Sequence, residues 1–291
     1  MVPSATEALF ALGLGDHVVA VTHECDFPPD ASALPRLTRS VLPPDLPAAE
    51  IDARVRELVA AGRALYELDD AALAELDPEL IVTQAVCEVC AVSYDDVRAV
   101  AQRLPSRPRV LSVDPTRLDE VLAGLETVAG AAGEPGSGRA LVAELSARLH
   151  RIEVDVGGAE RPRVAALEWL DPPYVAGHWV PDMVAAAGGV EVLGLAGGRS
   201  RTAHWREVGD ARPDVVVVMP CGLDAAAAAA EADRHRDELA ATGAGRVVAV
   251  DAAASFSRPG PRLVDGVGLL AHLLHPDALA APPTVAYREI V

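Results

Sequence analysis

Short runs of β-branched residues alternate along the chain with longer segments in which apolar residues recur every three or four positions. The short runs predict buried strands, and the longer segments predict amphipathic helices. The strands are expected at 18–21, 80–83, 110–113, 164–167, 190–193, 215–218 and 247–250, and helices at 71–76, 118–131 and 263–274. Strands that alternate with helices are typical of βα units and parallel sheets, so the pattern predicts an α/β fold.

Two similar segments, at 73–84 and 208–219, indicate that the chain has two halves. In each, a helix ends at a Pro–acid pair and a buried strand follows, which leads to Cys87 in one copy and Cys221 in the other. Between them, the GEPGSG sequence at 133–138 is typical of a helix end followed by a helix start, and 139–156 has helical apolar spacing. A helix of about 20 residues is about 30 Å long, which is enough to connect two lobes. The alternative is an ordinary helix packed on the first sheet.

This organisation predicts an N-terminal lobe over residues 1–134, a connecting helix over 135–157 and a C-terminal lobe over 158–291. Composition supports it, because 291 residues with 51% hydrophobic side chains exceed the usual size of a single core. A formal net charge of −18 argues against nucleic-acid binding, which needs clustered basic residues. The chain has no Lys, which excludes Schiff-base chemistry, and no apolar stretch long enough to span a membrane.

The N-terminal residues show neither a basic region nor an apolar region of the kind found in secretion signals. As written, the sequence predicts a cytoplasmic protein, and a periplasmic or extracellular one if its N-terminus is truncated. In a reducing compartment, the four cysteines are expected to bind metal or react rather than to form structural disulfides.

Chemically reactive residues follow several of the predicted strands. Ligands of open α/β sheets bind beyond the carboxyl ends of the strands, so these positions are expected to line a cleft. All four cysteines, which are Cys25, Cys87, Cys90 and Cys221, fall there. Three or four of them could ligate zinc or an iron–sulfur cluster. The alternatives are thiol–disulfide chemistry, direct contact with a cobalt complex, or packing as small hydrophobic side chains.

Two histidines and two tryptophans are further candidates for ligand binding. His23 lies beside Glu24, and His178 lies in the motif Gly-His-Trp-Val-Pro. Either imidazole could coordinate a metal, or be an ordinary hydrogen-bonded loop histidine. Trp169 follows a predicted strand, and Trp179 precedes a proline. At such positions a large flat ring either lines a pocket for a flat ligand or caps the core.

Two expected helix starts add candidates of another kind. The first, with Ser4 as the expected N-cap and Glu7 three residues on, reads as a capping box that also contains Thr6. A helix N-terminus of this kind can also meet an anion. In the second, Arg258 and Arg262 precede a helix and are available to pair with an acidic group.

These motifs resemble those of the helical-backbone metal-receptor superfamily, specifically the cobalamin-binding proteins of the class III periplasmic-binding type that serve ABC importers. The resemblance is carried by PSATE at 3–7, ALGLG at 11–15, THECD at 22–26, CEVCAVS at 87–93, EWLDPP at 168–173, GHWVP at 177–181, MPCG at 219–222 and RPGPR at 258–262. It implies two Rossmann-like lobes with parallel sheets joined by one long helix, with cobalamin, haem or a metal chelate held in the cleft between them. An ABC transporter permease is the implied partner.

Two functions are therefore carried forward. The first is a binding protein for a corrinoid or related metal complex, with Thr6, Glu7, His23, Glu24, Trp169, His178, Trp179 and Arg258 as the ligand-binding candidates. The second is a cytosolic metalloprotein, or an enzyme, in which Cys25, Cys87, Cys90 and Cys221 hold zinc or an iron–sulfur cluster. A partner protein that keeps the fold without a ligand is a third possibility. No motif of a hydrolase, kinase or dehydrogenase is present, so a binding protein is favoured over an enzyme.

Overall fold

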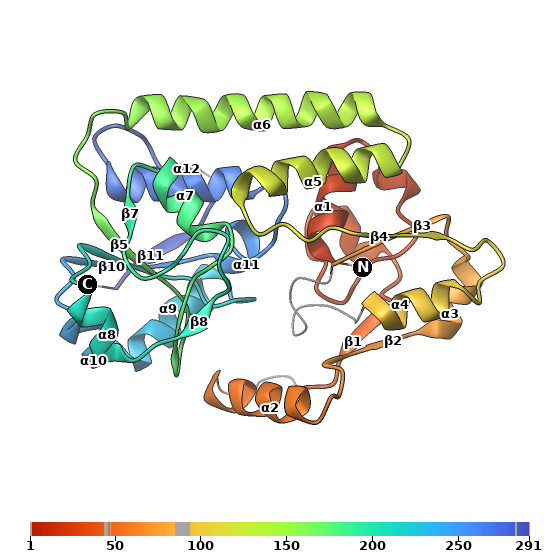
Figure 1. Cartoon of the computed structure of the whole chain (residues 1–291), viewed down its shortest axis with the longest axis horizontal. Helices are drawn as coiled ribbons and strands as arrows, with labels where there is room; N and C mark the ends of the chain where they lie inside the picture. Colours follow the sequence, from red (N-terminus) through yellow and green to blue (C-terminus); the bar gives the residue numbers. More distant parts are fainter. Residues whose placement is uncertain (1, 44–45, 47, 85–93, 283, 291) are drawn as a thin grey trace. The chain divides into compact units, whose positions relative to one another are not determined.

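The chain forms two compact units in a computed structural model that describes residues 2–43, 46, 48–84, 94–282 and 284–290 (Figure 1). Unit 1 comprises Met1–Asp114 and Leu122–Val142, and unit 2 comprises Pro115–Val121 and Ala143–Val291. Both contain parallel strands with helices, which confirms the predicted α/β fold class. The lobe boundaries predicted at residues 134 and 157 stay a prediction.

Unit 1 contains two small sheets and several helices. Strands β3 (Leu80–Thr83) and β4 (Arg109–Ser112) pair in parallel, and β1 (Thr38–Ser40) pairs with β2 (Tyr66–Leu68) antiparallel. The helices are α1 (Pro3–Ala11), α2 (Ala48–Ala60), α3 (Asp70–Leu76), α4 (Tyr94–Ala101) and most of α5 (Leu118–Ala131), with short 3₁₀ turns at Gly15–His17 and Pro29–Ala33. Leu73, Ile81 and Val97 are buried at the centre of one apolar cluster. This cluster fixes α3 and α4 on β3.

The strand predicted at 18–21 is not formed. Only Val21 makes a ladder contact, a parallel bridge to Arg36 with hydrogen bonds to Pro35 and Leu37. The apolar run before it is partly solvent-exposed, since Val19 is 46% exposed, so it lacks the buried neighbours that a central strand requires. The residues that follow Val21 therefore lie in a loop.

Unit 2 is built on one sheet. Its strand order is β11-β10-β9-β5-β6-β8, and β7 also pairs with β5. The strands are β5 (Arg163–Leu170), β6 (Pro173–Val175), β7 (Val190–Glu191), β8 (Arg201–Thr202), β9 (Val215–Val218), β10 (Arg246–Val250) and β11 (Tyr287–Glu289). β7, β5, β9 and β10 pair in parallel. β11 pairs antiparallel with β10, β6 antiparallel with β5, and β8 antiparallel with β6. The predicted parallel strands thus form the centre of a mixed sheet.

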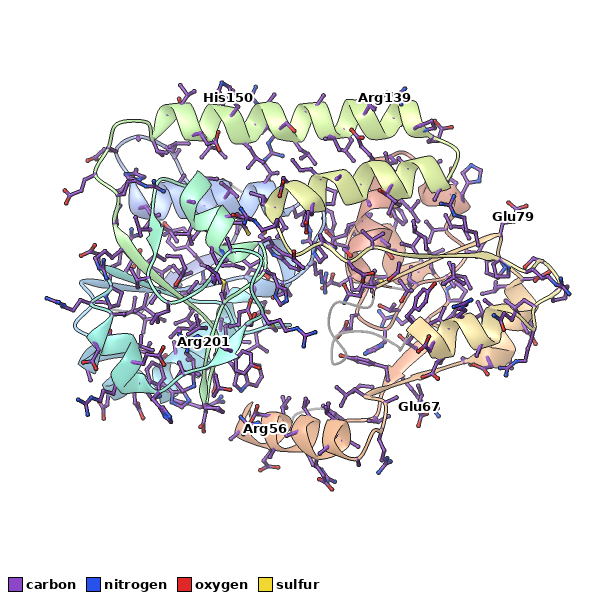
Figure 2. All side chains as sticks on the ribbon, in the orientation of Figure 1. Arg56, Glu67, Glu79, Arg139, His150 and Arg201 are labelled. Carbon is purple, nitrogen blue, oxygen red and sulfur yellow. The ribbon has the colours of Figure 1, made fainter. Side chains whose placement is uncertain are left out.

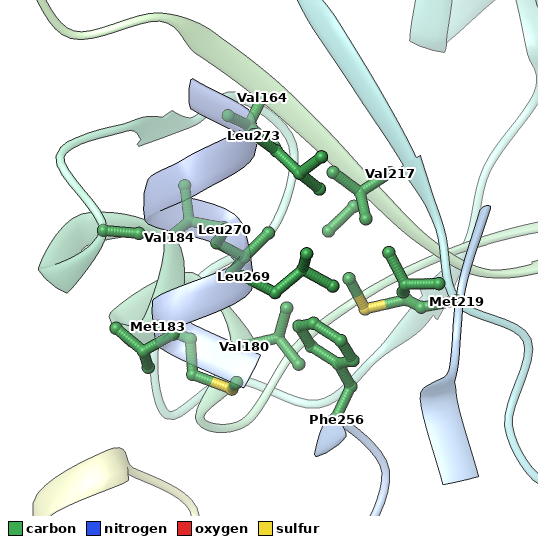
Figure 3. Close-up of a cluster of buried hydrophobic side chains, with 14 of the residues drawn as sticks. Val164, Val180, Met183, Val184, Val217, Met219, Phe256, Leu269, Leu270 and Leu273 are labelled. Carbon is green, nitrogen blue, oxygen red and sulfur yellow. The ribbon is translucent and has the colours of Figure 1, made fainter. Parts of the chain in front are cut away.

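Helices cover both faces of this sheet. They are α7 (Val180–Ala186), α8 (Trp205–Asp210), α9 (Ala225–Arg234), α10 (Arg236–Ala241), α11 (Ala252–Ser255) and α12 (Leu263–Leu274). One face packs side chains such as Val164 and Val217 against Leu270 of α12 (Figure 3). The alternate residues of the same strands pack on the other face against α8, α9 and α10. Apolar side chains on both faces explain why these strands read as unbroken Val and Ala runs.

One long helix, α6 (Pro135–Asp155), carries the chain from unit 1 into unit 2, and it is continuous in Figure 1. Its 21 residues correspond to about 30 Å at the usual rise of about 1.5 Å per residue. Polar side chains such as His150 point outward from it (Figure 2). Along the described part of the chain, no helix combines the length and the apolar character that crossing a bilayer requires.

Candidate functional site

The carboxyl edge of the unit 2 sheet brings together the last residues of β5 and the residues that follow β9. Met219 N–H donates to the carbonyl oxygen of Leu167 at 2.8 Å, and Cys221 N–H donates to that of Glu168 at 3.2 Å. Cys221 is exposed. Two of the segments singled out in the sequence therefore lie side by side at the edge where ligands of α/β folds bind.

Two acidic side chains lie at this edge. The carboxylate of Glu191, from β7, accepts hydrogen bonds from the backbone N–H groups of Ala166, Leu193 and Gly194 at 3.0–3.1 Å. Burial raises the pKa of Glu191 to about 7, although these hydrogen bonds favour the ionised form. Burial also raises the pKa of Glu168 to about 7, and the charge of Glu191 adds to the shift. Near neutral pH, both carboxyls therefore exchange protons readily.

The loop that contains His178 is held tightly beside these acids. His178 has a left-handed backbone conformation, with φ 50°, and its N–H donates to Gly198 at 2.6 Å. Ser200 Oγ accepts from Gly177 N–H at 3.1 Å and lies 3.4 Å from His178 Nδ1. A Cβ atom at Gly177 would come within 2.5 Å of the backbone of Gly198 and Ser200, so this close approach requires glycine. Burial, and next the charge of Arg199, lower the pKa of His178.

The two tryptophan candidates have different environments. Trp179 is buried in the core, and its indole N–H donates to the carbonyl oxygen of Phe256 at 2.8 Å. Trp169, near the end of β5, is partly exposed, yet its indole nitrogen is buried and has no hydrogen-bond partner in the described structure. Trp179 therefore has the contacts of a core residue, while Trp169 has a polar group that the fold leaves unsatisfied.

Cys25 and Thr6 meet in unit 1. The Cys25 thiol is buried, and its sulfur lies 3.2 Å from the hydroxyls of both Thr6 and Thr22. These contacts are those of a satisfied small buried side chain. Cys87 and Cys90 lie outside the described residues. Among the residues that are described, no group of three or more His, Cys, Asp or Glu side chains could hold a metal ion.

The histidine of unit 1 lies against a strand and an aromatic ring. His23 Nδ1 is 2.7 Å from the hydroxyl of Thr38, the first residue of β1, and its ring centroid is 5.3 Å from that of Tyr66 in β2. Burial, and then the charge of Arg36, lower the pKa of His23. The adjacent Glu24 N–H donates to Thr22 Oγ1 at 3.3 Å. His23 is thus oriented by the paired strands β1 and β2.

The predicted capping box at the first helix is wrong. Helix α1 starts at Pro3 with Val2 as the N-cap, so Ser4 and Glu7 lie inside the helix, where both are buried. Proline is favoured at the first helical position because it needs no N–H partner there, and this sets the start one residue before Ser4. Arg258 is partly buried between α11 and α12. As ligand contacts, Glu7, Arg258 and the other candidates stay predictions.

Sequence reasoning missed Glu191 and Ser200. Glu191 ends a two-residue strand within the run predicted as a strand at 190–193, and Ser200 lies 22 residues after the histidine that it contacts. The available signal was weak: a glycine-rich loop at 194–198 that follows a strand and leads to Ser200. Only the folded loop brings these side chains to Glu168 and His178.

The comparisons with known proteins agree on one fold. The profile of the periplasmic binding protein family matches residues 2–254. Among solved structures, a periplasmic heme-binding protein from Roseiflexus sp. RS-1 is 24% identical, with a TM-score of 0.71, and the match covers 95% of this chain and 97% of that one.

Two further structures are similar over nearly the whole chain. The periplasmic vitamin B12 binding protein of Vibrio cholerae is 21% identical, with a TM-score of 0.67 and 94% coverage of both chains. A periplasmic heme binding protein from Pseudomonas aeruginosa is 19% identical, with a TM-score of 0.72, 98% coverage of this chain and 95% of that one. No curated protein matches the sequence.

Proposed function

Because the chain belongs to the periplasmic binding protein family, we propose that it is a substrate-binding protein for an organic metal complex, cobalamin in the first place. In this role it binds the complex without chemical turnover and delivers it to an ABC transporter permease. Similarly folded proteins are described as binding heme or vitamin B12, and these names support the ligand class.

The observation that carries the proposal is the indole N–H of Trp169 at the carboxyl end of β5, which is buried and has no hydrogen-bond partner among the described residues. A buried donor without a partner costs about 1–3 kcal/mol, and a ligand acceptor that reached it after a small movement of the ring would recover that energy. The ring itself offers a flat apolar surface. The side chain therefore suits a large planar ligand that carries hydrogen-bonding groups at its rim.

The neighbouring acids support cobalamin over haem. The rim of a corrin carries neutral amides, whose N–H groups donate to carboxylates, whereas a haem carries two anionic propionates. Glu168 and Glu191 are both acceptors when ionised and repel further anions. The net charge of −18 also disfavours an anionic ligand such as haem.

Equilibrium dialysis of the purified protein against cobalamin and against haem tests the proposal. We expect one equivalent of cobalamin to be retained with micromolar or tighter affinity, and haem to be retained less tightly. Replacement of Trp169 by Phe keeps the ring and removes the N–H, and we expect it to weaken binding about tenfold. Retention of neither compound would contradict the proposed function.

The compartment and the transporter partner stay predictions. The permease is proposed from the family. A cysteine-ligated zinc or iron–sulfur site is not proposed, because the two described cysteines offer no such group: Cys25 is enclosed by threonine hydroxyls, and no metal-binding cluster occurs among the described residues.

A further inference from the structure

Ser200 has three polar neighbours, which together use the full hydrogen-bonding capacity of its hydroxyl. Its Oγ lies 3.1 Å from Gly177 N and 3.4 Å from His178 Nδ1, and the hydroxyl also hydrogen-bonds to the Glu168 carboxyl. A serine hydroxyl has one hydrogen to donate and two lone pairs that accept. The three neighbours therefore account for the one hydrogen and both lone pairs of the Ser200 hydroxyl.

When Glu168 is ionised, the chemistry of the neighbours fixes the direction of each bond. The Gly177 N–H can only donate, so it occupies one lone pair of Ser200. An ionised Glu168 can only accept, so it receives the Ser200 hydrogen. The remaining lone pair of Ser200 can only accept from His178, and the hydrogen of the neutral imidazole must then be on Nδ1. The other ring nitrogen, Nε2, is left with an unshared electron pair.

The surrounding backbone holds the ring in this arrangement. The His178 N–H donates to Gly198, and the His178 carbonyl accepts from Gly197 N–H at 2.9 Å. Both partners belong to the loop that ends at Ser200, so the imidazole and the hydroxyl are anchored to the same segment. His178 Nε2 has no hydrogen-bond partner among the residues that the structure describes.

We propose that Ser200 is a positioning residue that, together with Glu168, fixes His178 as the Nδ1–H tautomer and so presents Nε2 to the metal ion of the bound complex. The metal contact rests on the proposed function, whereas the tautomer is a property of the ligand-free protein. With aquocobalamin the step is a ligand exchange: the bond between cobalt and water breaks, a bond between cobalt and Nε2 forms, and water leaves. The cobalt keeps its oxidation state.

The tautomer is tested first, without any ligand. Long-range ¹H–¹⁵N NMR of the histidine rings at pH 8.5 distinguishes a hydrogen on Nδ1 from one on Nε2, and His178→Gln identifies the signal. We expect the Nδ1–H form in the wild-type protein and in Ser200→Thr, which keeps the hydroxyl. We expect a mixture dominated by Nε2–H in Ser200→Ala. A wild-type ring in the Nε2–H form, or a Ser200→Ala ring unchanged from wild type, overturns the positioning role.

The metal contact is tested by absorption spectroscopy with aquocobalamin, and with cyanocobalamin as the control because its cyanide exchanges poorly. We expect wild-type protein to shift the aquocobalamin spectrum and His178→Ala to bind without the shift. Ser200→Ala should bind about 10- to 100-fold more weakly, as is usual when the partner of a metal-bound histidine is lost, and Ser200→Thr should restore binding.

Wild-type binding without a spectral shift overturns the metal contact. Binding of neither cobalamin contradicts the proposed function instead, and the NMR result still decides the role of Ser200.

Discussion

The indole N–H of Trp179 donates to the carbonyl oxygen of Phe256 at 2.8 Å, and this bond ties the start of α7 to the residue that follows α11. Trp169, ten residues earlier, has no such bond within the described structure. The same residue type therefore has two functions in unit 2: one ring stabilises the core, and the other offers an unsatisfied donor.

This difference predicts opposite results for two matched substitutions. Trp179→Phe should lower the free energy of unfolding by about 1–3 kcal/mol, because the Phe256 carbonyl loses its partner, and should leave cobalamin affinity nearly unchanged. Trp169→Phe should leave stability unchanged or slightly higher and weaken binding. Urea unfolding and dialysis on both variants check this. Equal effects of the two variants on binding would contradict the assignment.

The raised pKa values of Glu168 and Glu191 predict that stability falls as pH rises. The folded pKa of Glu168 and Glu191 is about 7, above the ordinary value of 4.5, so the folded state binds more protons than the unfolded state between these values. Their contribution is complete below about pH 4.5 and is lost as pH rises through 7. A shift of this size corresponds to at most about 3 kcal/mol per carboxyl, and coupling within the pair reduces the sum.

Urea midpoints at pH 5, 6, 7 and 8 measure this dependence. We expect Glu168→Gln, which removes one titrating group, to flatten the decline in stability between pH 5 and 8. Glu207→Gln is the matched control, because Glu207 is exposed and its pKa is lowered by its hydrogen bond to Arg201. If Glu168→Gln and wild type decline with the same slope, the raised pKa of Glu168 is wrong.

The close approach at Gly177 predicts that the His178 loop does not tolerate a side chain there. Gly177→Ala places a Cβ atom within 2.5 Å of Ser200 N and Gly198 O, so the loop must move. We expect a loss of more than about 2 kcal/mol in stability and weaker ligand binding. Gly130→Ala in α5, where no atom lies within 4 Å of the added Cβ, should instead stabilise the protein by about 0.5–1 kcal/mol. Thermal unfolding of the pair distinguishes them.

The two described cysteines should differ in reactivity. Cys221 is exposed and Cys25 is buried, with its sulfur between two threonine hydroxyls. In native protein treated with iodoacetamide, peptide mass spectrometry should show Cys221 modified at least about 100-fold faster than Cys25, because the buried thiol reacts only after local opening. Comparable rates would mean that Cys25 is accessible, and they would reopen its role in binding.

The sequence predicted the elements whose pattern is strongest. The runs at 80–83 and 215–218 and the helices at 118–131 and 263–274 form over the predicted residues, because the strands are mostly or fully buried and the helices are long with a clear period. The short strands β1, β2, β6 and β8 were missed, since two or three residues carry no period. The run at 18–21 failed because its residues are partly exposed.

The site was predictable only where a residue follows a strand. Glu168 and Cys221 could be placed at one edge because parallel strands bring their carboxyl ends together. Ser200 and Glu191 act through hydrogen bonds across a loop whose path the sequence does not reveal. The environment of Trp179 was also hidden, because a tryptophan in a loop motif is compatible with a pocket wall or with the core.

Isothermal titration of the purified protein with cobalamin measures whether the protein binds this ligand and whether Trp169 contributes to the affinity, with Trp169→Phe and Trp179→Phe titrated in parallel. We expect one site of micromolar or tighter affinity in the wild type, about tenfold weaker binding in Trp169→Phe, and near wild-type affinity in Trp179→Phe. The absence of any heat of binding in the wild type, with dialysis also negative, would contradict the proposed function.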